Sequence, residues 1–476
     1  MCGIVGVVGS ENSTTIILDG LKKLEYRGYD SAGITVLQNN HFKTIKERGK
    51  IAKLEEALVG NISNAQIGIG HTRWATHGAP TKENAHPHSS SLVCVVHNGI
   101  VENHQELKEN LQKTGAKFIS QTDTEVIPYL IEHYLEKTND IKTAITLATK
   151  EISGSFAIAV MFKDYDNVIA VAKQGSPLVL GIGENENFIA SDYYALSDYT
   201  NKIVNLDDGE FGLIYKDRIE IFDENQNPIN KKAKTIESKK NNISKDGYEH
   251  FMLKEIYEQP KVLQETIETY VSLTNSTINL ANYPFDLSKI NKITLIACGT
   301  SYFASMCAKY LIEDIAKVEV EVDIASEFRY RSHPFRSDNL MIFVSQSGET
   351  ADTLAALKFA KENNQKILSI VNAPFSSMAN LSDIVIRTVA GPEIGVASTK
   401  AYTAQVATLA LFAIDLAVKK NVISKEGVSK LIGEVVSSAS KISNVLEPKN
   451  VNNIKKIAKT LKRAKHVLYI GRGLSQ

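Results

Sequence analysis

The chain begins Met1-Cys2-Gly3-Ile4-Val5-Gly6-Val7-Val8, which places a cysteine directly before a short apolar run. Such a run predicts a buried β-strand that starts almost at the first residue. Once the initiator methionine is removed, the thiol of Cys2 lies beside its own α-amine. That amine has an unperturbed pKa of about 7.7–8.0, so it can act as a base near neutral pH. This pairing serves acyl transfer in known enzymes, but Cys2 could also be a small residue that merely opens a buried strand.

Residues 1–235 are predicted to form a layered α+β domain. Short apolar segments bounded by Gly, Asn and Asp predict strands at 4–8, 66–70, 92–96, 156–162, 168–172 and 211–215. Two helices are expected, at 14–25 and at 123–137, the second with an acidic first turn. Many strands with separate helices are typical of layered α+β folds.

A polar stretch rich in Lys and Asn, 237–247, indicates a linker, to which we assign residues 236–250. After it, strands alternate with helices, which favours a parallel, doubly wound α/β sheet over residues 251–447. The strands are expected at 293–297, 318–324, 340–344, 367–371 and 383–388. Residues 467–475 repeat the strand-and-loop pattern of 293–301. We therefore expect 448–476 to start a second, similar subdomain that the chain leaves incomplete.

The overall composition indicates a cytoplasmic enzyme. Lys plus Arg and Asp plus Glu both number 54, so the balance gives no reason to expect nucleic acid or an anionic membrane as a partner. The four cysteines, at 2, 94, 298 and 307, are too scattered for a disulfide framework. The N-terminus lacks the pattern of a signal peptide, and the apolar run 406–414 is too short to span a membrane.

The segment 95–103 (VVHNGIVEN) places Asn98 and Gly99 just after a predicted strand. An asparagine amide and the following glycine N–H can donate together to a developing oxyanion, and glycine lets the backbone approach closely. The competing interpretation is an Asn-Gly hairpin turn.

Two further segments supply charges that could bind a free amino acid. In 71–78 (HTRWATHG), Arg73 could hold an α-carboxylate through a bidentate pair, or it could be a solvated loop residue. Asp123 could pair with an α-ammonium group, or it could be a helix N-cap. A nucleophile, an oxyanion hole, a cation and an anion are what hydrolysis of an amino acid amide requires, and the sequence offers all four.

Six histidines crowd the same part of the chain, at 71, 77, 86, 88, 97 and 104. Their spacing includes one H-x-H but neither HExxH nor a cysteine partner, so the motifs argue against a metal site. We therefore expect chemistry without a metal or a redox cofactor.

Five motifs, taken in order, make the first half resemble the class II glutamine amidotransferases. They are MCGIVG (1–6), LEYRGYDSAG (24–33), HTRWATHG (71–78), HNGIVEN (97–103) and TDTEV (122–126). The resemblance implies an N-terminal-nucleophile hydrolase fold with αββα layers, in which Cys2 is the nucleophile and Asn98 and Gly99 form the oxyanion hole. It also implies that Trp74 closes over the site and screens the ammonia path. The glutamine-binding residues that it implies are Arg73, Trp74, Thr76, His77 and Asp123.

In the second half, two loops follow predicted strands and open helices, namely 298–301 (CGTS) and 345–350 (SQSGET). Free N–H groups at a helix N-terminus, with Ser and Thr hydroxyls alongside, bind phosphate. Ligands of such sheets bind at the carboxyl ends of the strands. The alternative is a pair of ordinary Ser/Thr-capped helices, and the lack of a Walker lysine argues against a nucleotide.

With KEIYEQP (254–260) and EIGVASTKA (393–401), these loops resemble the sugar isomerase (SIS) domain. The resemblance implies L-glutamine and fructose 6-phosphate as substrates, glucosamine 6-phosphate as product, an ammonia channel, no cofactor and a homodimer. The sugar-phosphate contacts that it implies are Thr300, Ser301, Ser345, Gln346, Ser347, Thr350 and Ser398.

The family's isomerase lysine, glutamate and histidine belong to a second SIS subdomain and a C-terminal tail. We therefore expect this chain to retain glutaminase but to lack part of the isomerase site. Lys400 is expected to be a structural lysine at a helix start. Two alternatives stay open: an amidotransferase that feeds a phosphoribosyl acceptor, and a sugar-phosphate sensor that does not catalyse.

Overall fold

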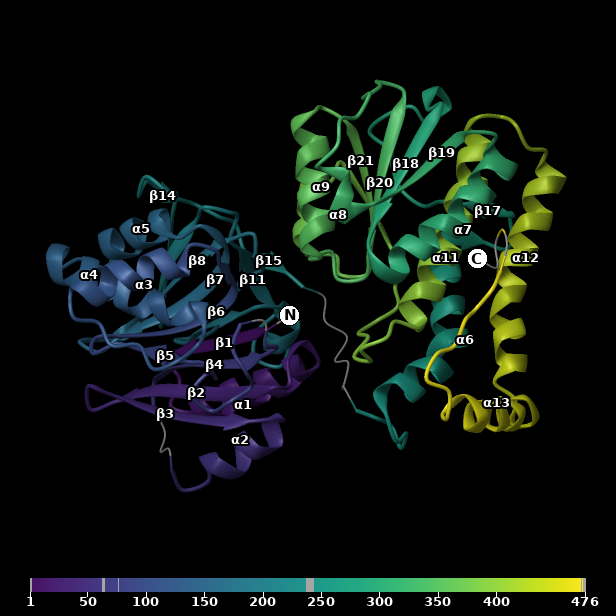
Figure 1. Ribbon diagram of the computed structural model, residues 1–476. Helices are drawn as coiled ribbons and strands as arrows, with labels where there is room; N and C mark the ends of the chain where they lie inside the picture. The colour runs from purple at the N-terminus through teal and green to yellow at the C-terminus, as the bar shows by residue number, and fades with distance from the viewer. Residues whose placement is uncertain (1, 62–64, 76, 237–243, 472, 474–476) are drawn as a thin grey trace. The chain divides into compact units, whose positions relative to one another are not determined.

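The computed structural model describes residues 2–61, 65–75, 77–236, 244–471 and 473. The chain divides into two compact units, Met1–Ile243 and Ser244–Gln476, each with its own sheets and helices (Figure 1). The boundary falls inside the stretch 236–250 assigned above to a linker, of which 237–243 lie outside the described residues.

The first unit contains two antiparallel sheets. One has the strand order β15-β11-β9-β10-β1-β4-β2-β3, and the other has the order β14-β13-β12-β8-β7-β6-β5. The strands of the first sheet are β1 (Gly3–Val8), β2 (Ser31–Gln38), β3 (His41–Arg48), β4 (Ile67–Arg73), β9 (Val179–Ile182), β10 (Asn187–Ala190), β11 (Lys202–Asn205) and β15 (Lys234–Thr235). Those of the second are β5 (His88–Ser89), β6 (Val93–Val101), β7 (Gly154–Phe162), β8 (Tyr165–Gln174), β12 (Phe211–Tyr215), β13 (Ile219–Phe222) and β14 (Pro228–Ile229).

Helices cover the outer faces of both sheets (Figure 1). Those on the first sheet are α1 (Ser13–Leu24) and α2 (Ile51–Leu58), and those on the second are α3 (His104–Lys113), α4 (Val126–Thr138) and α5 (Ile141–Glu151). Side chains of a strand alternate between its faces. In β1, Val5 and Val7 pack in the core under α1, whereas Ile4 and Val8 pack between the two sheets. The αββα prediction is therefore confirmed.

Neither strand of the β2–β3 hairpin was predicted from the sequence. β3 is a polar edge strand, HFKTIKER, with no buried residue, whereas β2, SAGITVLQ, is buried and was simply not identified. The turn between them was readable, since Asn39 and Asn40 both have positive φ, at 50° and 62°, as a tight hairpin turn requires. The predicted helix 123–137 begins with a 3₁₀ turn, Asp123–Glu125, before α4.

The second unit is built on a five-stranded parallel sheet of order β19-β18-β20-β21-β22, so the α/β prediction is also confirmed. Its strands are β18 (Lys292–Ala297), β19 (Glu319–Ile324), β20 (Asn339–Ser345), β21 (Lys366–Val371) and β22 (Ile384–Arg387), with a small hairpin of β16 (Val271–Ser272) and β17 (Thr277–Ile278). One face shares a core with α6 (Phe251–Tyr270), α7 (Gly299–Ala316) and α11 (Lys400–Lys419), and α12 (Lys425–Val445) packs on α6 and α11. The other face packs against α8 (Ala325–Phe328), α9 (Ala351–Glu362) and α10 (Ser377–Leu381).

The helix α11 is long and apolar enough to cross a membrane, the one such helix among the described residues. It is mostly buried, however, and its Leu409, Phe412 and Leu416 are fully enclosed in the core of the second unit. Burial inside the protein accounts for its apolar composition.

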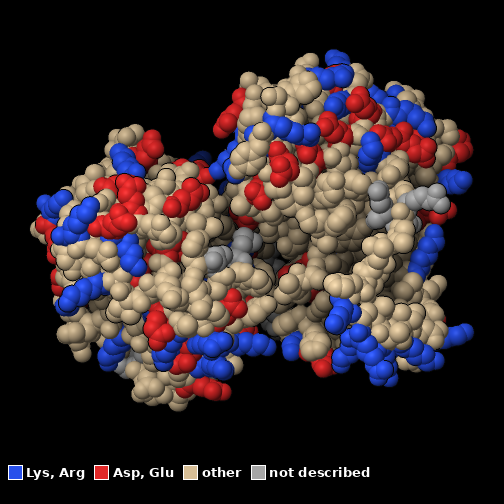
Figure 2. Space-filling view, in the orientation of Figure 1, with Lys and Arg blue, Asp and Glu red and all other residues tan. Residues whose placement is uncertain are grey.

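The last described segment differs from the prediction. Residues 467–470 were expected to form a strand but have no regular secondary structure, and Leu468, Tyr469 and Ile470 are more than four-fifths exposed. A strand needs hydrogen bonds to a neighbour, and none of the described sheets includes this segment. The preceding α13 (Pro448–Leu461), described throughout, has no buried residue. Lysines and arginines gather over it in Figure 2, although the whole chain has no net charge.

Candidate active site

Strand pairing places Cys2 at the end of β4. β1 pairs antiparallel with β4, with Gly3 opposite Thr72 and Ile4 opposite His71. The residue before β1 therefore lies beside the residues that follow Arg73. The backbone N–H of Trp74 donates a hydrogen bond to Cys2 Sγ over 3.2 Å, so the register of one strand pair fixes the thiol against the HTRWATHG segment.

The thiol is held largely in its neutral form. Burial raises the pKa of Cys2, and the negative charge of Asp123 adds to that rise. The Trp74 N–H and the positive charge of Arg73 act in the opposite direction but do not outweigh burial. A base next to the sulfur is therefore needed to make it a nucleophile.

Asn98 contacts the backbone of the cysteine directly. Its Nδ2 donates to the Cys2 carbonyl oxygen over 3.1 Å and to Ser191 Oγ over 2.8 Å. Asn98 was predicted to follow a strand, but β6 continues through it to Val101, so the hairpin-turn interpretation is wrong. The strand continues because β7 pairs with β6 over its whole length, a partnership that the local sequence does not reveal.

Gly99 is required where it stands. Its φ of +143° lies in a region that side chains rarely adopt, and an added Cβ would lie 1.9 Å from the carbonyl oxygen of Ser155. The lack of a side chain at Gly99 therefore lets the end of β6 lie close to the backbone of Ser155.

Arg73 holds a loop. Its guanidinium donates to the carbonyl oxygens of His77, Gly78 and Ala79, the last two over 3.3 Å. The guanidinium is therefore partly engaged by the backbone that follows β4. The side chain of His77 packs edge-on against His104, with ring centroids 5.6 Å apart. Thr76 lies outside the described residues.

Asp123 is buried, and its carboxylate binds a backbone N–H of β6 instead of one in its own helix. Its Oδ2 accepts the backbone N–H of Val101 over 2.8 Å, so it links the 3₁₀ turn to β6 rather than capping its own helix. Its charge also reaches Cys2 and Arg73. The structure thus brings together the predicted nucleophile, cation and anion.

Three residues near Cys2 were missed by the sequence analysis. Asp30 accepts the N–H of Ala75 over 2.9 Å and donates its own N–H to the Arg73 carbonyl oxygen over 3.0 Å. Ser191 and His71 both contact the Asn98 amide. Asp30 and His71 lie within the motifs quoted above, whereas Ser191 follows β10 without any sequence signal.

Four of the six clustered histidines are buried together, namely His71, His86, His88 and His97. Burial lowers the pKa of His71 to about 3 and holds the pKa values of His86 and His88 well below their ordinary value. Among the described residues, no group of three or more His, Cys, Asp or Glu side chains is placed to hold a metal ion. The cluster is a set of neutral, packed rings.

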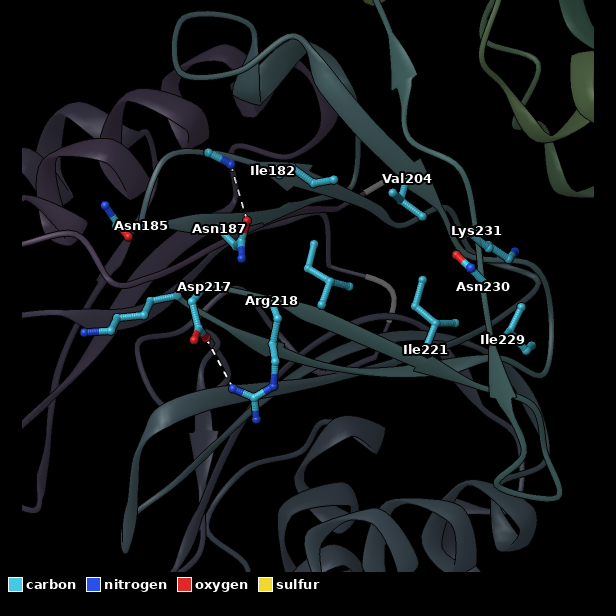
Figure 3. Close-up of a pocket in the computed structure, with 13 residues that line it drawn as sticks. Ile182, Asn185, Asn187, Val204, Asp217, Arg218, Ile221, Ile229, Asn230 and Lys231 are labelled. Carbon is cyan, nitrogen blue, oxygen red and sulfur yellow. Dashed lines mark hydrogen bonds and ion pairs between the residues drawn. The ribbon is translucent and has the colours of Figure 1, made fainter.

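A cavity of about 360 Å³ lies elsewhere in the first unit (Figure 3). Isoleucines and Val204 form its apolar side, and Asn187, Lys216, Arg218 and Lys231 contribute polar groups, with Arg218 paired to Asp217. Its lining includes none of the predicted site residues, so we do not assign the reaction to it.

In the second unit, the loop 345–350 connects β20 to α9 and is braced by its own side chains. Ser345 Oγ accepts the N–H of Gly348 over 3.0 Å and lies 3.2 Å from Thr350 Oγ1. Ser347 Oγ accepts the N–H of Glu349 over 3.1 Å. Gly348 has a φ of +65°, and an added Cβ would lie 2.0 Å from Ser376 Oγ. Such a compact loop at a helix N-terminus suits a phosphate group.

The loop 298–301 lies at the same edge of the sheet, because β18 and β20 are parallel neighbours. Thr300 and Ser301 belong to the first turn of α7. Ser301 Oγ accepts a hydrogen bond from Gln405 Nε2 over 3.0 Å, a partner that the sequence analysis did not find. Gln346 contributes its carbonyl oxygen to the N–H of Asn372 over 3.1 Å.

Two buried or half-buried carboxylates brace the segment 393–401. Glu255 of α6 accepts the N–H of Gly395 over 3.0 Å. Glu393 accepts from Ser398 Oγ and from the Thr399 N–H, both over 2.8 Å. Lys400 is nearly buried at the start of α11 and pairs with Glu258 across 2.7 Å, as a structural lysine would.

Comparisons with known proteins agree with the domain type predicted for each half of the chain. Residues 71–198 match the glutamine amidotransferase domain family, and residues 286–415 match the SIS domain family. The chain is therefore an amidotransferase joined to a sugar isomerase domain.

More particularly, the chain belongs to the glutamine–fructose-6-phosphate aminotransferases (isomerizing). It is 42% identical to the enzyme of that name from Brucella abortus over 475 residues, which are 100% of this chain and 78% of that protein. It is 46% identical to the one from Caldanaerobacter subterraneus over 479 residues, with the same coverage. Among solved structures, the C-terminal domain of glucosamine-fructose-6-phosphate aminotransferase from Francisella tularensis matches with a TM-score of 0.46 and 42% identity, over 48% of this chain and 64% of that one.

Proposed function

We propose that this chain hydrolyses L-glutamine at Cys2 and that the ammonia serves the conversion of fructose 6-phosphate to glucosamine 6-phosphate, with the glutaminase step as the part whose catalytic residues the sequence analysis located. The observation that carries the proposal is the contact between the Asn98 amide and the backbone of Cys2 over 3.1 Å. The contact brings the Asn98 amide next to a cysteine that follows the initiator methionine, which supports the proposed role of that amide as an oxyanion donor. The choice of glutamine and fructose 6-phosphate as substrates rests on membership of the family.

In the first step, the Cys2 sulfur attacks the side-chain amide carbon of glutamine, and the thiol proton passes to the free α-amine of Cys2. The carbonyl π electrons move onto the oxygen, where Asn98 Nδ2 and the Gly99 N–H donate. The C–N bond then breaks, and the proton taken from the thiol leaves with the nitrogen as ammonia. Water hydrolyses the thioester to glutamate and restores the thiol.

The remaining predicted residues bind the two substrates. Arg73 and Asp123 provide the charges for the α-carboxylate and the α-ammonium group, with Trp74, Thr76 and His77 around them. The sugar phosphate would bind where β18 and β20 end, at Thr300, Ser301, Ser345, Gln346, Ser347 and Thr350, with Ser398 from the braced segment. The resemblance to the family also supports a homodimer that works in the cytoplasm, and sedimentation of the purified chain tests the dimer.

The test is Cys2→Ala, with Cys307→Ala in the other unit as the matched control. Loss of the nucleophile should lower glutaminase activity by roughly 10³-fold or more, whereas the control should keep it. Glutamate and glucosamine 6-phosphate are measured in the same reaction, and the melting temperature reports folding. Near-normal glutamate release by folded Cys2→Ala would refute the assignment.

A further inference from the structure

The side chain of Asn98 is engaged on both ends of its amide. Its Oδ1 lies 3.0 Å from His71 Nε2, while its Nδ2 donates to the Cys2 carbonyl oxygen and to Ser191 Oγ. The side chains of Asn98, His71 and Ser191 are all buried. An amide oxygen and an amide nitrogen differ only in which can donate, so the neighbours decide which end faces the cysteine.

The His97 carbonyl oxygen lies 3.0 Å from His71 Nε2 and can only accept, so it favours the tautomer with the proton on Nε2. Asn98 Oδ1 at 3.0 Å and His86 Nδ1 at 3.2 Å then lie on the acceptor side of the same N–H. His71 Nδ1 has no hydrogen-bond partner among the described residues. The ring is fully buried and packs against His86 with centroids 4.1 Å apart, so it is held in place and stays neutral.

The reverse orientation of the amide is disfavoured at both ends. Turning it would point an N–H₂ group at the His71 N–H and the amide oxygen at the Cys2 carbonyl oxygen. Two repulsive contacts would then replace two hydrogen bonds, each worth about 0.5–1.5 kcal/mol. The orientation with Nδ2 toward Cys2 is the one that satisfies every partner.

Ser191 holds the nitrogen end. Its Oγ accepts both from Asn98 Nδ2 over 2.8 Å and from the backbone N–H of Ile4 over 2.7 Å. Its own N–H donates to the Ile4 carbonyl oxygen over 3.0 Å. Ser191 thus ties the amide to β1, the strand that carries the nucleophile.

We propose that His71 and Ser191 are positioning residues for glutamine hydrolysis: together they hold the Asn98 amide with its N–H groups toward Cys2. They contact neither substrate nor thiol and act through Asn98. The proposal rests on the proposed roles of Cys2 and Asn98. One Nδ2 proton stays on Ser191 Oγ, and the other, which lies on the Cys2 carbonyl oxygen in this structure, can be given to an oxyanion that forms at Cys2. An amide held in this orientation limits the reorganisation that the exchange needs, which raises kcat rather than the affinity for glutamine.

The test uses His71→Leu, His71→Gln and Ser191→Ala, each also made in the Asn98→Ala background. We expect His71→Leu to lower the glutaminase kcat about 10- to 100-fold while KM changes less than about threefold, because removal of a whole oxyanion donor costs 10²–10³. His71→Gln keeps an N–H near the Nε2 position and should recover part of the loss. In the Asn98→Ala background, neither His71→Leu nor Ser191→Ala should lower kcat further.

Ser191→Ala repeats the test with a smaller change, in case His71→Leu does not fold. Its matched control is Ser13→Ala, at the start of α1 and away from the site. This change removes a buried hydroxyl that donates to the Ala65 carbonyl oxygen. The control should cost stability but not kcat. Effects that add fully to Asn98→Ala, or that appear only in KM, would overturn the positioning role even if Cys2→Ala is inactive. Activity of Cys2→Ala would instead refute the proposed function itself.

Discussion

Gln405 donates a hydrogen bond from its Nε2 to the hydroxyl oxygen of Ser301 over 3.0 Å, although 104 residues separate the two along the chain. Gln405 is almost fully buried in α11. Because Ser301 Oγ accepts this bond, its own proton is available for another acceptor. At the edge of the parallel sheet, where we propose that the sugar phosphate binds, that arrangement leaves Ser301 able to donate to an anion.

Gln405→Glu should weaken binding of fructose 6-phosphate about tenfold. A carboxylate accepts hydrogen bonds, so the Ser301 proton would turn toward it and be lost to the phosphate, a change of about 1.5 kcal/mol. Titration calorimetry measures the Kd, and Gln405→Met, which brings no acceptor, should lose less. Equal affinity of folded Gln405→Glu and the unaltered chain would contradict this role.

The fluorescence of Trp74 should change when the cysteine site is filled. It is the single tryptophan of the chain, is 38% exposed, and packs edge-on against Tyr29 with centroids 5.4 Å apart. If it closes over glutamine, a glutamine analogue that alkylates Cys2 should shift the emission to shorter wavelength by excluding water. The same analogue with Cys2→Ala serves as the control, and an unchanged spectrum after complete alkylation would argue against closure.

The first unit should lose stability as the pH falls below about 6.5. In the unfolded chain the buried histidines have an ordinary pKa near 6.5 and bind protons there, whereas burial lowers the pKa of His71 to about 3 and that of His88 well below its usual value. Each such histidine makes the free energy of unfolding fall by up to about 1.4 kcal/mol per pH unit.

Urea unfolding followed by Trp74 emission between pH 7.5 and 5 measures this dependence. His88→Gln should reduce the slope of the free energy of unfolding against pH by up to about 1.4 kcal/mol per pH unit, which is the contribution of one proton. His41→Gln, at an exposed histidine, should leave that slope unchanged. A free energy of unfolding that does not change over this range would mean that the buried rings are not the groups that respond.

Gly395→Ala should destabilise the second unit by about 1–3 kcal/mol, a common cost of overpacking. The added Cβ would lie 2.5 Å from Glu255 Oε2, which accepts the Gly395 N–H. Displacing that carboxylate loosens the segment that carries Ser398, so sugar-phosphate binding should weaken as well.

Thermal unfolding of Gly395→Ala checks the prediction. Gly433→Ala in α12 is the control, because nothing lies within 4 Å of its added Cβ. It should raise stability by about 0.5–1 kcal/mol, since alanine favours a helix over glycine. A stable Gly395→Ala with normal sugar-phosphate binding would show that Glu255 does not brace the segment.

Sequence alone located the central strands of each sheet and the helices α1 and α4, because hydrophobic periodicity and helix ends are local signals. Both sheets of the first unit and the parallel sheet of the second contain the predicted segments. It missed the polar edge strand β3 and also buried strands such as β2, and it predicted a strand at 467–470, where the described residues offer no partner strand.

For the candidate site, sequence by itself determined the kinds of groups present and the family to which they belong: the cysteine at position 2, the Asn98-Gly99 pair and the Ser/Thr loops. Tertiary structure decided which groups meet. The register of β1 on β4 brings Trp74 to Cys2, and Ser191 reaches Asn98 from 93 residues away. The physical reason is that a hydrogen bond depends on distance and direction in space, and strand pairing between remote segments sets both, whereas a motif records only neighbours along the chain.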